Sequence, residues 1–213
     1  MSAYLYIEGS KTGDDSKEQQ ARCREAYRKL LEKAGFAGRM PRLVACGGRN
    51  AAFDEFTTAH KGGRTSDFVG MLIDSEAPVA DPEKPWDHLK HRPGDLWERP
   101  TKAKDEQVLF MTTCMETWIA ADRETLRQHY GSKLKESSLP PLPNLEARQA
   151  HEVQDKLVKA TADCSNAYAK GDRSFQVLAE LNPEALKSLP SFARCLRILE
   201  EKLERPSGRG RRG

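Results

Sequence analysis

The pattern of hydrophobic and polar positions predicts strands that alternate with helices. The strongest apolar run, FVGMLIDSE at 68–76, lies between polar residues and predicts a strand buried on both faces, as in a parallel sheet. Helical spacing predicts helices at 16–34 and 51–60. Three shorter apolar runs predict further strands, at 4–7, 41–46 and 108–114. Because this order is typical of parallel βαβ units, we expect an α/β fold with a mostly parallel central sheet flanked by helices.

The rest of the chain predicts an insertion, a linker and a helical region. Between 77 and 104 the periodicity disappears and prolines recur, which predicts a long loop without regular structure. The composition of 132–144 turns to Ser, Pro and Leu and indicates a linker. Further helices are predicted from near Glu116 and at 122–130, 146–162, 174–181, 183–189 and 191–204. We therefore expect a first domain at 1–131, a helical region at 145–204 packing on it, and a disordered basic tail at 205–213.

Acidic residues follow two of the predicted strands where each strand ends. Glu8 follows the strand at 4–7, and Asp74 and Glu76 end the run at 68–76. Since ligands bind at the carboxyl ends of strands in open α/β sheets, we expect these carboxylates to converge there. Two carboxylates about 4 Å apart repel by about 1 kcal/mol in water, and a bound cation relieves that repulsion. Oxygen ligands without His or Cys favour Mg²⁺ or Mn²⁺, ions that commonly serve phosphate chemistry. Helix capping or loop solvation is the alternative interpretation.

A glycine-rich turn is the next candidate. It comprises Gly47, Gly48, Arg49 and Asn50, between a predicted strand and a predicted helix. Backbone amides at such a helix start can cradle phosphate, and the Arg49 guanidinium adds a bidentate donor. An ordinary tight turn is the alternative.

The predicted loop at 77–104 holds histidines and tryptophans with two interpretations each. His88 and His91 have a spacing that could ligate a metal, but histidines in a flexible loop are more often solvated. Trp86 and Trp97 could stack on nucleic-acid bases, although anchoring the loop to the domain is the preferred interpretation.

Composition narrows the class of protein. Of 213 residues, 38% are hydrophobic and 31% charged, as in soluble globular proteins. No apolar segment approaches the roughly 20 residues that span a bilayer, and no signal region is evident, so we expect a cytoplasmic protein without a membrane partner. Five scattered cysteines without a CxxC pair argue against disulfides and structural zinc. A net charge of +3 does not itself indicate nucleic acid, although the tail RPSGRGRRG could add non-specific phosphate affinity or have no function.

The acidic pattern resembles that of the Toprim group of catalytic domains, found in topoisomerases, primases and nucleases of the overcoming-lysogenization-defect type. That group has a Glu after the first strand and an Asp-x-Asp after the third, which correspond here to Glu8, Asp74 and Glu76. Glu76 departs from the pattern by one methylene. From Tyr4 to about Leu189 the chain is also similar to a small bacterial Toprim-like family of unknown function, encoded beside ABC/AAA-type ATPases in anti-phage defence islands. The motifs are YIEG, ACGGRN, LIDSE, PWDHL, CMETWIAAD and YAKGDRSF.

The resemblance implies a nuclease dependent on Mg²⁺ or Mn²⁺, with its Toprim-like catalytic domain at 1–131. It implies phosphodiester hydrolysis of DNA or RNA in anti-phage defence, with an ATPase partner encoded nearby; a homodimer is a further expectation. Glu116 is implied to be another acidic ligand or a base that positions water, and Lys170 to lie against the scissile phosphate. The alternative interpretation of Glu116 is a carboxylate favoured at a helix start, and that of Lys170 is an exposed lysine in a turn.

Two other function classes compete with the nuclease. In one, the chain is a non-catalytic module that docks on the ATPase through its C-terminal helices, whose apolar faces would then be exposed. The other is nucleotidyl transfer as in primases. We rank it last, because the sequence has no Walker A motif and no clear triphosphate cradle beyond the GGRN turn.

Overall fold

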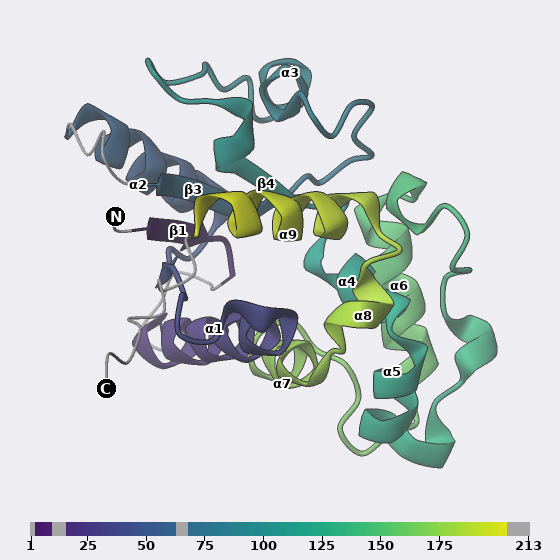
Figure 1. Cartoon of the computed structure of the whole chain (residues 1–213). Coiled ribbons are helices and arrows are strands. Elements are labelled where there is room, and N and C mark those ends of the chain that lie inside the picture. Colours follow the sequence, from purple (N-terminus) through teal and green to yellow (C-terminus); the bar gives the residue numbers. More distant parts are fainter. Residues whose placement is uncertain (1–2, 10–15, 63–67, 204–213) are drawn as a thin grey trace, which may run out of the picture.

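A parallel sheet forms the centre of the protein. The computed structural model of the chain describes residues 3–9, 16–62 and 68–203. In these residues four strands form one all-parallel sheet in the order β2-β1-β3-β4, which confirms the predicted α/β fold (Figure 1). The strands are β1 (Ala3–Ile7), β2 (Arg42–Ala45), β3 (Phe68–Asp74) and β4 (Val108–Met111).

Apart from α3, the α-helices follow the predicted segments, with ends shifted by a few residues. Helix α1 continues into a π-helical turn at Glu32–Phe36, and Gly35 adopts a φ of 94° within it. The α-helices are α1 (Ser16–Leu31), α2 (Arg49–Lys61), α3 (Pro85–His91), α4 (Met115–Ala121), α5 (Arg123–Tyr130), α6 (Ala150–Thr161), α7 (Asp172–Glu180), α8 (Pro183–Leu186) and α9 (Pro190–Lys202). Among the described residues no helix is long and apolar enough to cross a membrane. The predicted basic tail at 205–213 lies outside the described residues.

Helices cover both faces of the sheet. Successive side chains of a strand point to opposite faces, so the strands contribute buried residues to two cores. On one face, the buried strand residues pack with α1, α4, α6, α7 and α9; they are Leu5, Ile7, Phe68, Leu72, Leu109 and Met111. On the other face, α2, α3 and the segment after α3 cover Tyr6, Val69, Met71, Ile73, Val108 and Phe110. The near-continuous apolar sequence of β3 therefore reflects a strand buried on both sides.

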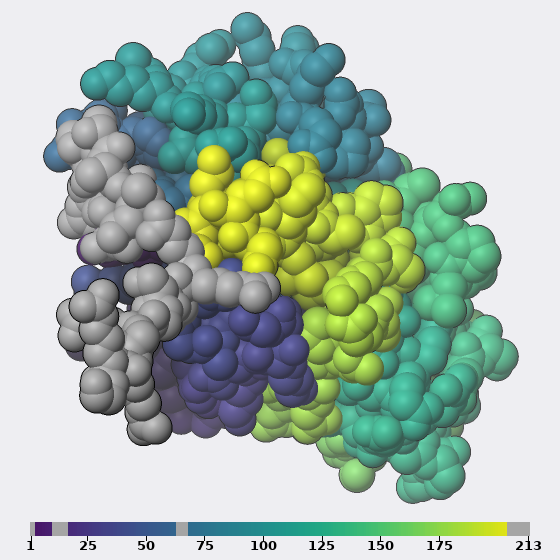
Figure 2. Space-filling view, viewed as in Figure 1, coloured from purple at the N-terminus to yellow at the C-terminus, as the bar shows by residue number. Residues whose placement is uncertain are grey.

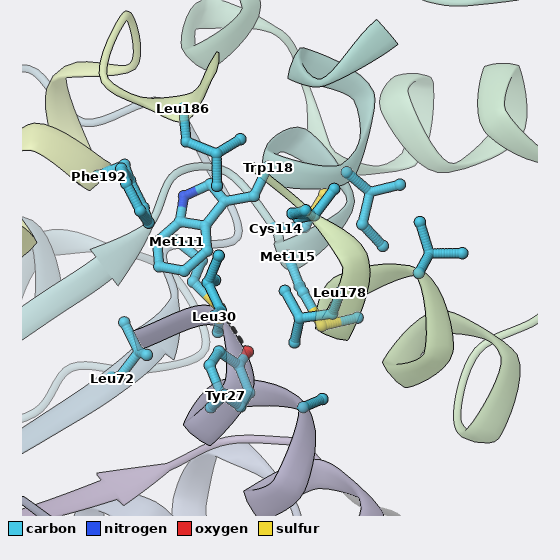
Figure 3. Packing of buried hydrophobic residues seen from close by; sticks show 14 of the residues in the cluster. Tyr27, Leu30, Leu72, Met111, Cys114, Met115, Trp118, Leu178, Leu186 and Phe192 are labelled. Atoms are coloured by element: carbon cyan, nitrogen blue, oxygen red, sulfur yellow. Dashed lines mark hydrogen bonds between the residues drawn. The ribbon is translucent and has the colours of Figure 1, made fainter. Parts of the chain in front are cut away.

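The C-terminal helices share the larger core with the sheet. Trp118 of α4 meets the ring of Phe192 of α9 edge-on, at 4.9 Å between ring centroids, and Leu186 of α8 lies beside them (Figure 3). Tyr27 of α1 donates a hydrogen bond to the sulfur of Met111 at 2.8 Å in the same core. The described part of the helical region at 145–204 therefore packs on the sheet and shares its hydrophobic core. The predicted linker at 132–144 is also structured in part: it includes a 3₁₀ turn at Glu136–Ser138 and the buried side chain of Leu139.

The segment at 77–104 is more ordered than its sequence indicated. The prediction of a loop without regular structure was wrong, because α3 forms there with Pro85 in its first turn, where a missing amide costs no helical hydrogen bond. Trp97 stacks on Phe53 of α2 at 4.2 Å between centroids, and the indole of Trp86 donates to the Lys104 carbonyl at 3.2 Å. Both tryptophans are buried and anchor the segment to α2.

Helix α9 lies against β4, one of the two edge strands of the described sheet. Figure 2 shows its outer side at the surface, between the blue-green segment that holds α3 and the purple α1. The buried guanidinium of Arg194 donates to the carbonyl of Val108 at 2.8 Å and to that of Asp105 at 2.9 Å. Arg197 reaches Glu83 of the inserted segment at 2.7 Å. These contacts fasten α9 to the start of β4 and to the inserted segment.

Candidate metal centre

The three acidic residues predicted at the strand ends do meet. Strands β1 and β3 pair in parallel, with Ile7 opposite Leu72, so their carboxyl ends lie at the same edge of the sheet. Glu8 directly follows β1, Asp74 is the last residue of β3, and Glu76 follows two residues later. One carboxylate oxygen from each lies within 4.8 Å of the others. We call Glu8, Asp74 and Glu76 the acidic triad.

Backbone amides hold the triad in place. The amide of Asp74 donates to Oε2 of Glu8 at 3.0 Å, and the amide of Met115, at the start of α4, donates to Oδ1 of Asp74 at 2.8 Å. Glu76 has a φ of 63° and donates its own amide to the Thr113 carbonyl at 2.8 Å. Among the described residues, the second oxygens of Glu8 and Asp74 have no hydrogen-bond donor and remain available to a ligand.

Burial makes ionisation of Glu8 and Asp74 costly. It raises the pKa of Glu8 to about 7, although the nearby Arg49 charge opposes the shift. The pKa of Asp74 lies well above its ordinary value, first because of burial and then because of the charges of Glu8 and Glu116. A bound cation offsets both effects, since it favours the charged carboxylates.

Glu8 and Asp74 line a pocket of about 200 Å³, whereas Glu76 is not among its lining residues. Glu8, Asp74 and Glu116 are its acidic lining residues, and Lys170 is its basic one. Backbone forms much of the remaining wall, because four lining residues are glycines: Gly9, Gly47, Gly48 and Gly171. The pocket thus brings together carboxylates, a cation and exposed main chain.

Glu116 lies in this pocket but outside the triad. Its side chain is almost fully buried, with 2% exposed. The hydroxyl of Tyr168 donates a short hydrogen bond to Oε1 of Glu116, and Nε2 of Gln154 donates to Oε2 at 3.4 Å. The structure therefore places Glu116 beside the triad, with its carboxylate held by two residues of the C-terminal region.

Lys170 lies in the turn before α7, on the wall of the pocket. Its side chain is exposed and forms no hydrogen bond or ion pair with any described residue. Its charge lowers the pKa of both Glu8 and Asp74, against the larger effect of burial. Lys170 is therefore close enough to act on a ligand bound at the triad.

The glycine-rich turn reaches the pocket only in part. Gly47, with a φ of 87°, and Gly48, the N-cap of α2, line the pocket, whereas Arg49 and Asn50 are not among its lining residues. The Arg49 guanidinium donates to both oxygens of Asp95, at 3.0 and 2.7 Å, and to the carbonyl of Asp74. Its side chain therefore joins the triad to the inserted segment.

The two histidines do not join the triad. The Nε2–H group of His88 donates to the Ser75 carbonyl at 2.9 Å, and the Nδ1–H group of His91 donates to the Asp87 carbonyl at 2.7 Å. Burial lowers the pKa of His88, which favours the neutral ring. In the described residues neither belongs to a group of potential metal ligands.

Three partners of the site were not found by sequence reasoning. Tyr168 belongs to the motif YAKGDRSF, which drew attention to its neighbour Lys170 alone. Gln154 and Asp95 gave no signal, because one lies on an ordinary amphipathic helix and the other in a segment without periodicity.

The donor set fits a hard divalent cation. All candidate ligands are carboxylate oxygens, and neither His nor Cys lies in the group. Mg²⁺ and Mn²⁺ accept such ligands, whereas zinc sites usually include nitrogen or sulfur. The acidic triad could therefore hold a metal ion.

Comparison with known proteins gives one match. No curated protein and no solved structure matches the chain. A family model matches residues 14–200, a range that includes Asp74, Glu76, Glu116 and Lys170 but begins after Glu8. Since the match covers most of the chain, this protein belongs to the family described as a domain of unknown function (DUF4276).

Proposed function

We propose that the protein is a divalent-metal-dependent nuclease that hydrolyses phosphodiester bonds of DNA or RNA. The observation that carries this proposal is the acidic triad, whose oxygens lie within 4.8 Å of one another at the carboxyl edge of a parallel sheet. A bound Mg²⁺ or Mn²⁺ ion would supply Lewis-acid chemistry toward a phosphodiester.

Other pocket residues suit a phosphate ligand. The Lys170 ammonium has no internal partner among the described residues and can balance negative charge on a phosphate. Gly47 and Gly48 precede α2, whose N-terminus offers amides and a positive dipole end. Glu116 is an oriented carboxylate that can hold a water molecule or accept a proton.

The resemblance of the acidic spacing to Toprim domains supports the same proposal and extends it. On that resemblance we propose a nucleic-acid substrate, a role in anti-phage defence and an ATPase partner of the ABC/AAA type. Co-expression with the product of a neighbouring ATPase gene, followed by co-purification, tests the partner separately from the chemistry. Separate elution of the two proteins at micromolar concentration would count against the partner.

The alternative function, a non-catalytic module that docks on an ATPase, has less support. It requires apolar faces of the C-terminal helices to be exposed, but α7 and α9 direct their large apolar side chains into the core. In the described residues the exposed large hydrophobic side chains are scattered: Leu96, Leu142 and Val158.

Cleavage assays with matched variants test the nuclease. Single-stranded DNA, duplex DNA and RNA are incubated with the protein in Mg²⁺, Mn²⁺ or EDTA, with and without the ATPase and ATP. Asp74→Asn and Glu8→Gln should each reduce metal-dependent cleavage by at least about 100-fold. Asp163→Asn is the control, because Asp163 is an exposed acid paired with Lys135. Cleavage that persists in Asp74→Asn would overturn the proposal.

A further inference from the structure

The C-terminal region contributes an ordered hydrogen-bond donor to the acidic pocket. Tyr168 lies 52 residues after Glu116 in sequence, yet its hydroxyl reaches Oε1 of that carboxylate. Both side chains are buried, so water does not substitute freely for either partner. Burial and the charge of Glu116 raise the pKa of Tyr168, which keeps the hydroxyl protonated and able to donate.

The backbone of Tyr168 is fixed as well as its ring. Its amide donates to the hydroxyl oxygen of Thr161 at 2.9 Å, and that hydroxyl donates to the Leu157 carbonyl at 3.0 Å, in the last turns of α6. Gln154, also on α6, donates to the other oxygen of Glu116. One helix and the turn after it therefore set the orientation of the Glu116 carboxylate.

Glu116 in turn acts on the triad. It lines the same pocket as Glu8 and Asp74. An oriented carboxylate in the same pocket strengthens the negative potential that attracts a cation. Partners that orient such carboxylates commonly change metal affinity by about 10- to 100-fold when they are removed.

We propose that Tyr168 is a positioning residue of the cation site, acting through its hydrogen bond to Glu116. This inference rests on the proposed metal centre, but not on cleavage itself. Tyr168 does not line the pocket. Its contribution is the fixed direction of the Glu116 carboxylate.

The experiment must distinguish an effect through Glu116 from an effect through Lys170. Lys170 lies two residues after Tyr168 in the same turn, so a change at Tyr168 could act by moving the lysine. A double-mutant cycle with Glu116→Gln distinguishes the two routes, because only an effect through Glu116 disappears when that carboxylate is absent.

The test measures Mn²⁺ binding to the full chain by isothermal titration calorimetry. Tyr168→Phe should weaken Mn²⁺ affinity by about 10-fold, and it should cause no further loss in the Glu116→Gln background. Tyr130→Phe is the matched control, because Tyr130 is also buried but its hydroxyl has no hydrogen-bond partner in the structure. That variant should bind Mn²⁺ as the wild type does.

The outcomes separate this inference from the nuclease proposal. Wild-type affinity in Tyr168→Phe, or an equal loss with and without Glu116, would overturn the role of Tyr168. If the wild type binds Mn²⁺ but cleaves no nucleic acid, the nuclease proposal fails and the affinity ratios still decide the inference. A wild type that binds no Mn²⁺ overturns both. Should Tyr168→Phe not fold, Gln154→Leu takes its place in the same design with the same criteria.

Discussion

Arg49 and Asp95 form a bidentate ion pair between the start of α2 and the inserted segment. The two hydrogen bonds measure 3.0 and 2.7 Å, and the side chains are only 10% and 2% exposed, respectively. Arg49 also donates to the Asp74 carbonyl and lies over the ring of Trp97 at 4.9 Å from its centroid. Arg49 thus connects the acidic triad to the segment at 77–104, for which the sequence predicted no regular structure.

Removal of the Asp95 charge should destabilise the protein. We expect Asp95→Asn to lower the free energy of unfolding at pH 7 by about 2 to 3 kcal/mol, because Arg49 then keeps a buried charge with a weaker acceptor. Chemical denaturation measures the change. Asp163→Asn, which removes an exposed carboxylate paired with Lys135, should have a much smaller effect.

The effect of Asp95→Asn should also depend on pH. Burial opposes ionisation of Asp95, but hydrogen bonds and charges from Arg49 and Arg92 outweigh it and hold the pKa below its ordinary value of 3.8. A lowered pKa in the folded state gives stability above pH 3.8 that is lost as the pH falls through the folded value. The difference in unfolding free energy between wild type and Asp95→Asn should therefore become smaller below pH 4. A constant gap from pH 7 to pH 3 would contradict this account.

Glu8→Gln should stabilise the metal-free protein at alkaline pH. Burial raises the pKa of Glu8 from 4.5 to about 7. Stability linked to its proton is therefore complete below pH 4.5 and is lost as the pH rises through about 7. At about 1.4 kcal/mol per pKa unit, the difference corresponds to about 3 kcal/mol as an upper value. Glutamine avoids this loss, and its side-chain oxygen can still accept from the Asp74 amide.

Thermal unfolding in EDTA at pH 5 and pH 8 measures this effect. The melting temperature of Glu8→Gln should exceed that of the wild type at pH 8 only. Addition of Mn²⁺ should then raise the melting temperature of the wild type but not of the variant. Glu136→Gln is a control without this gain, because Arg127 lowers the pKa of the exposed Glu136. A less stable Glu8→Gln at pH 8 in EDTA would be inconsistent with a costly buried charge.

Lys170 should matter for activity and not for stability. We expect Lys170→Ala to reduce cleavage by about 100-fold while the melting temperature stays unchanged, since its ammonium has no partner among the described residues. Lys90→Ala is the matched control: Lys90 is also exposed and without a described partner, but it lies on α3 outside the pocket. Equal activity in the two variants would remove Lys170 from the proposed machinery.

Close packing beside the triad should require a glycine at position 9. A Cβ atom at this position would lie 2.6 Å from the sulfur of Cys23 in α1, which is closer than real contacts allow. We expect Gly9→Ala to cost about 1 to 3 kcal/mol in the free energy of unfolding, measured by urea denaturation. Gly62→Ala should be close to neutral, because its Cβ would meet the nearest atom at an ordinary 3.5 Å.

A second substitution tests the cause of the Gly9 effect. Cys23→Ala should cost less stability in the Gly9→Ala background than in the wild type, because it removes the atom that the new methyl would contact. Additive losses would show that Gly9 is required for another reason.

The sequence by itself determined the strands, their parallel direction and the acids at their carboxyl ends, whereas the structure showed that β1 and β3 are neighbours. These features follow from local periodicity and from the geometry of parallel strands, which is why Glu8 and Asp74 could be expected at the same edge of the sheet. Only the tertiary structure decided which partners hold the site: Asp95 for Arg49, and Tyr168 with Gln154 for Glu116. These pairs join residues 38 to 52 positions apart. Side-chain partners at such distances depend on how helices pack over the sheet, and local residue patterns do not encode that packing.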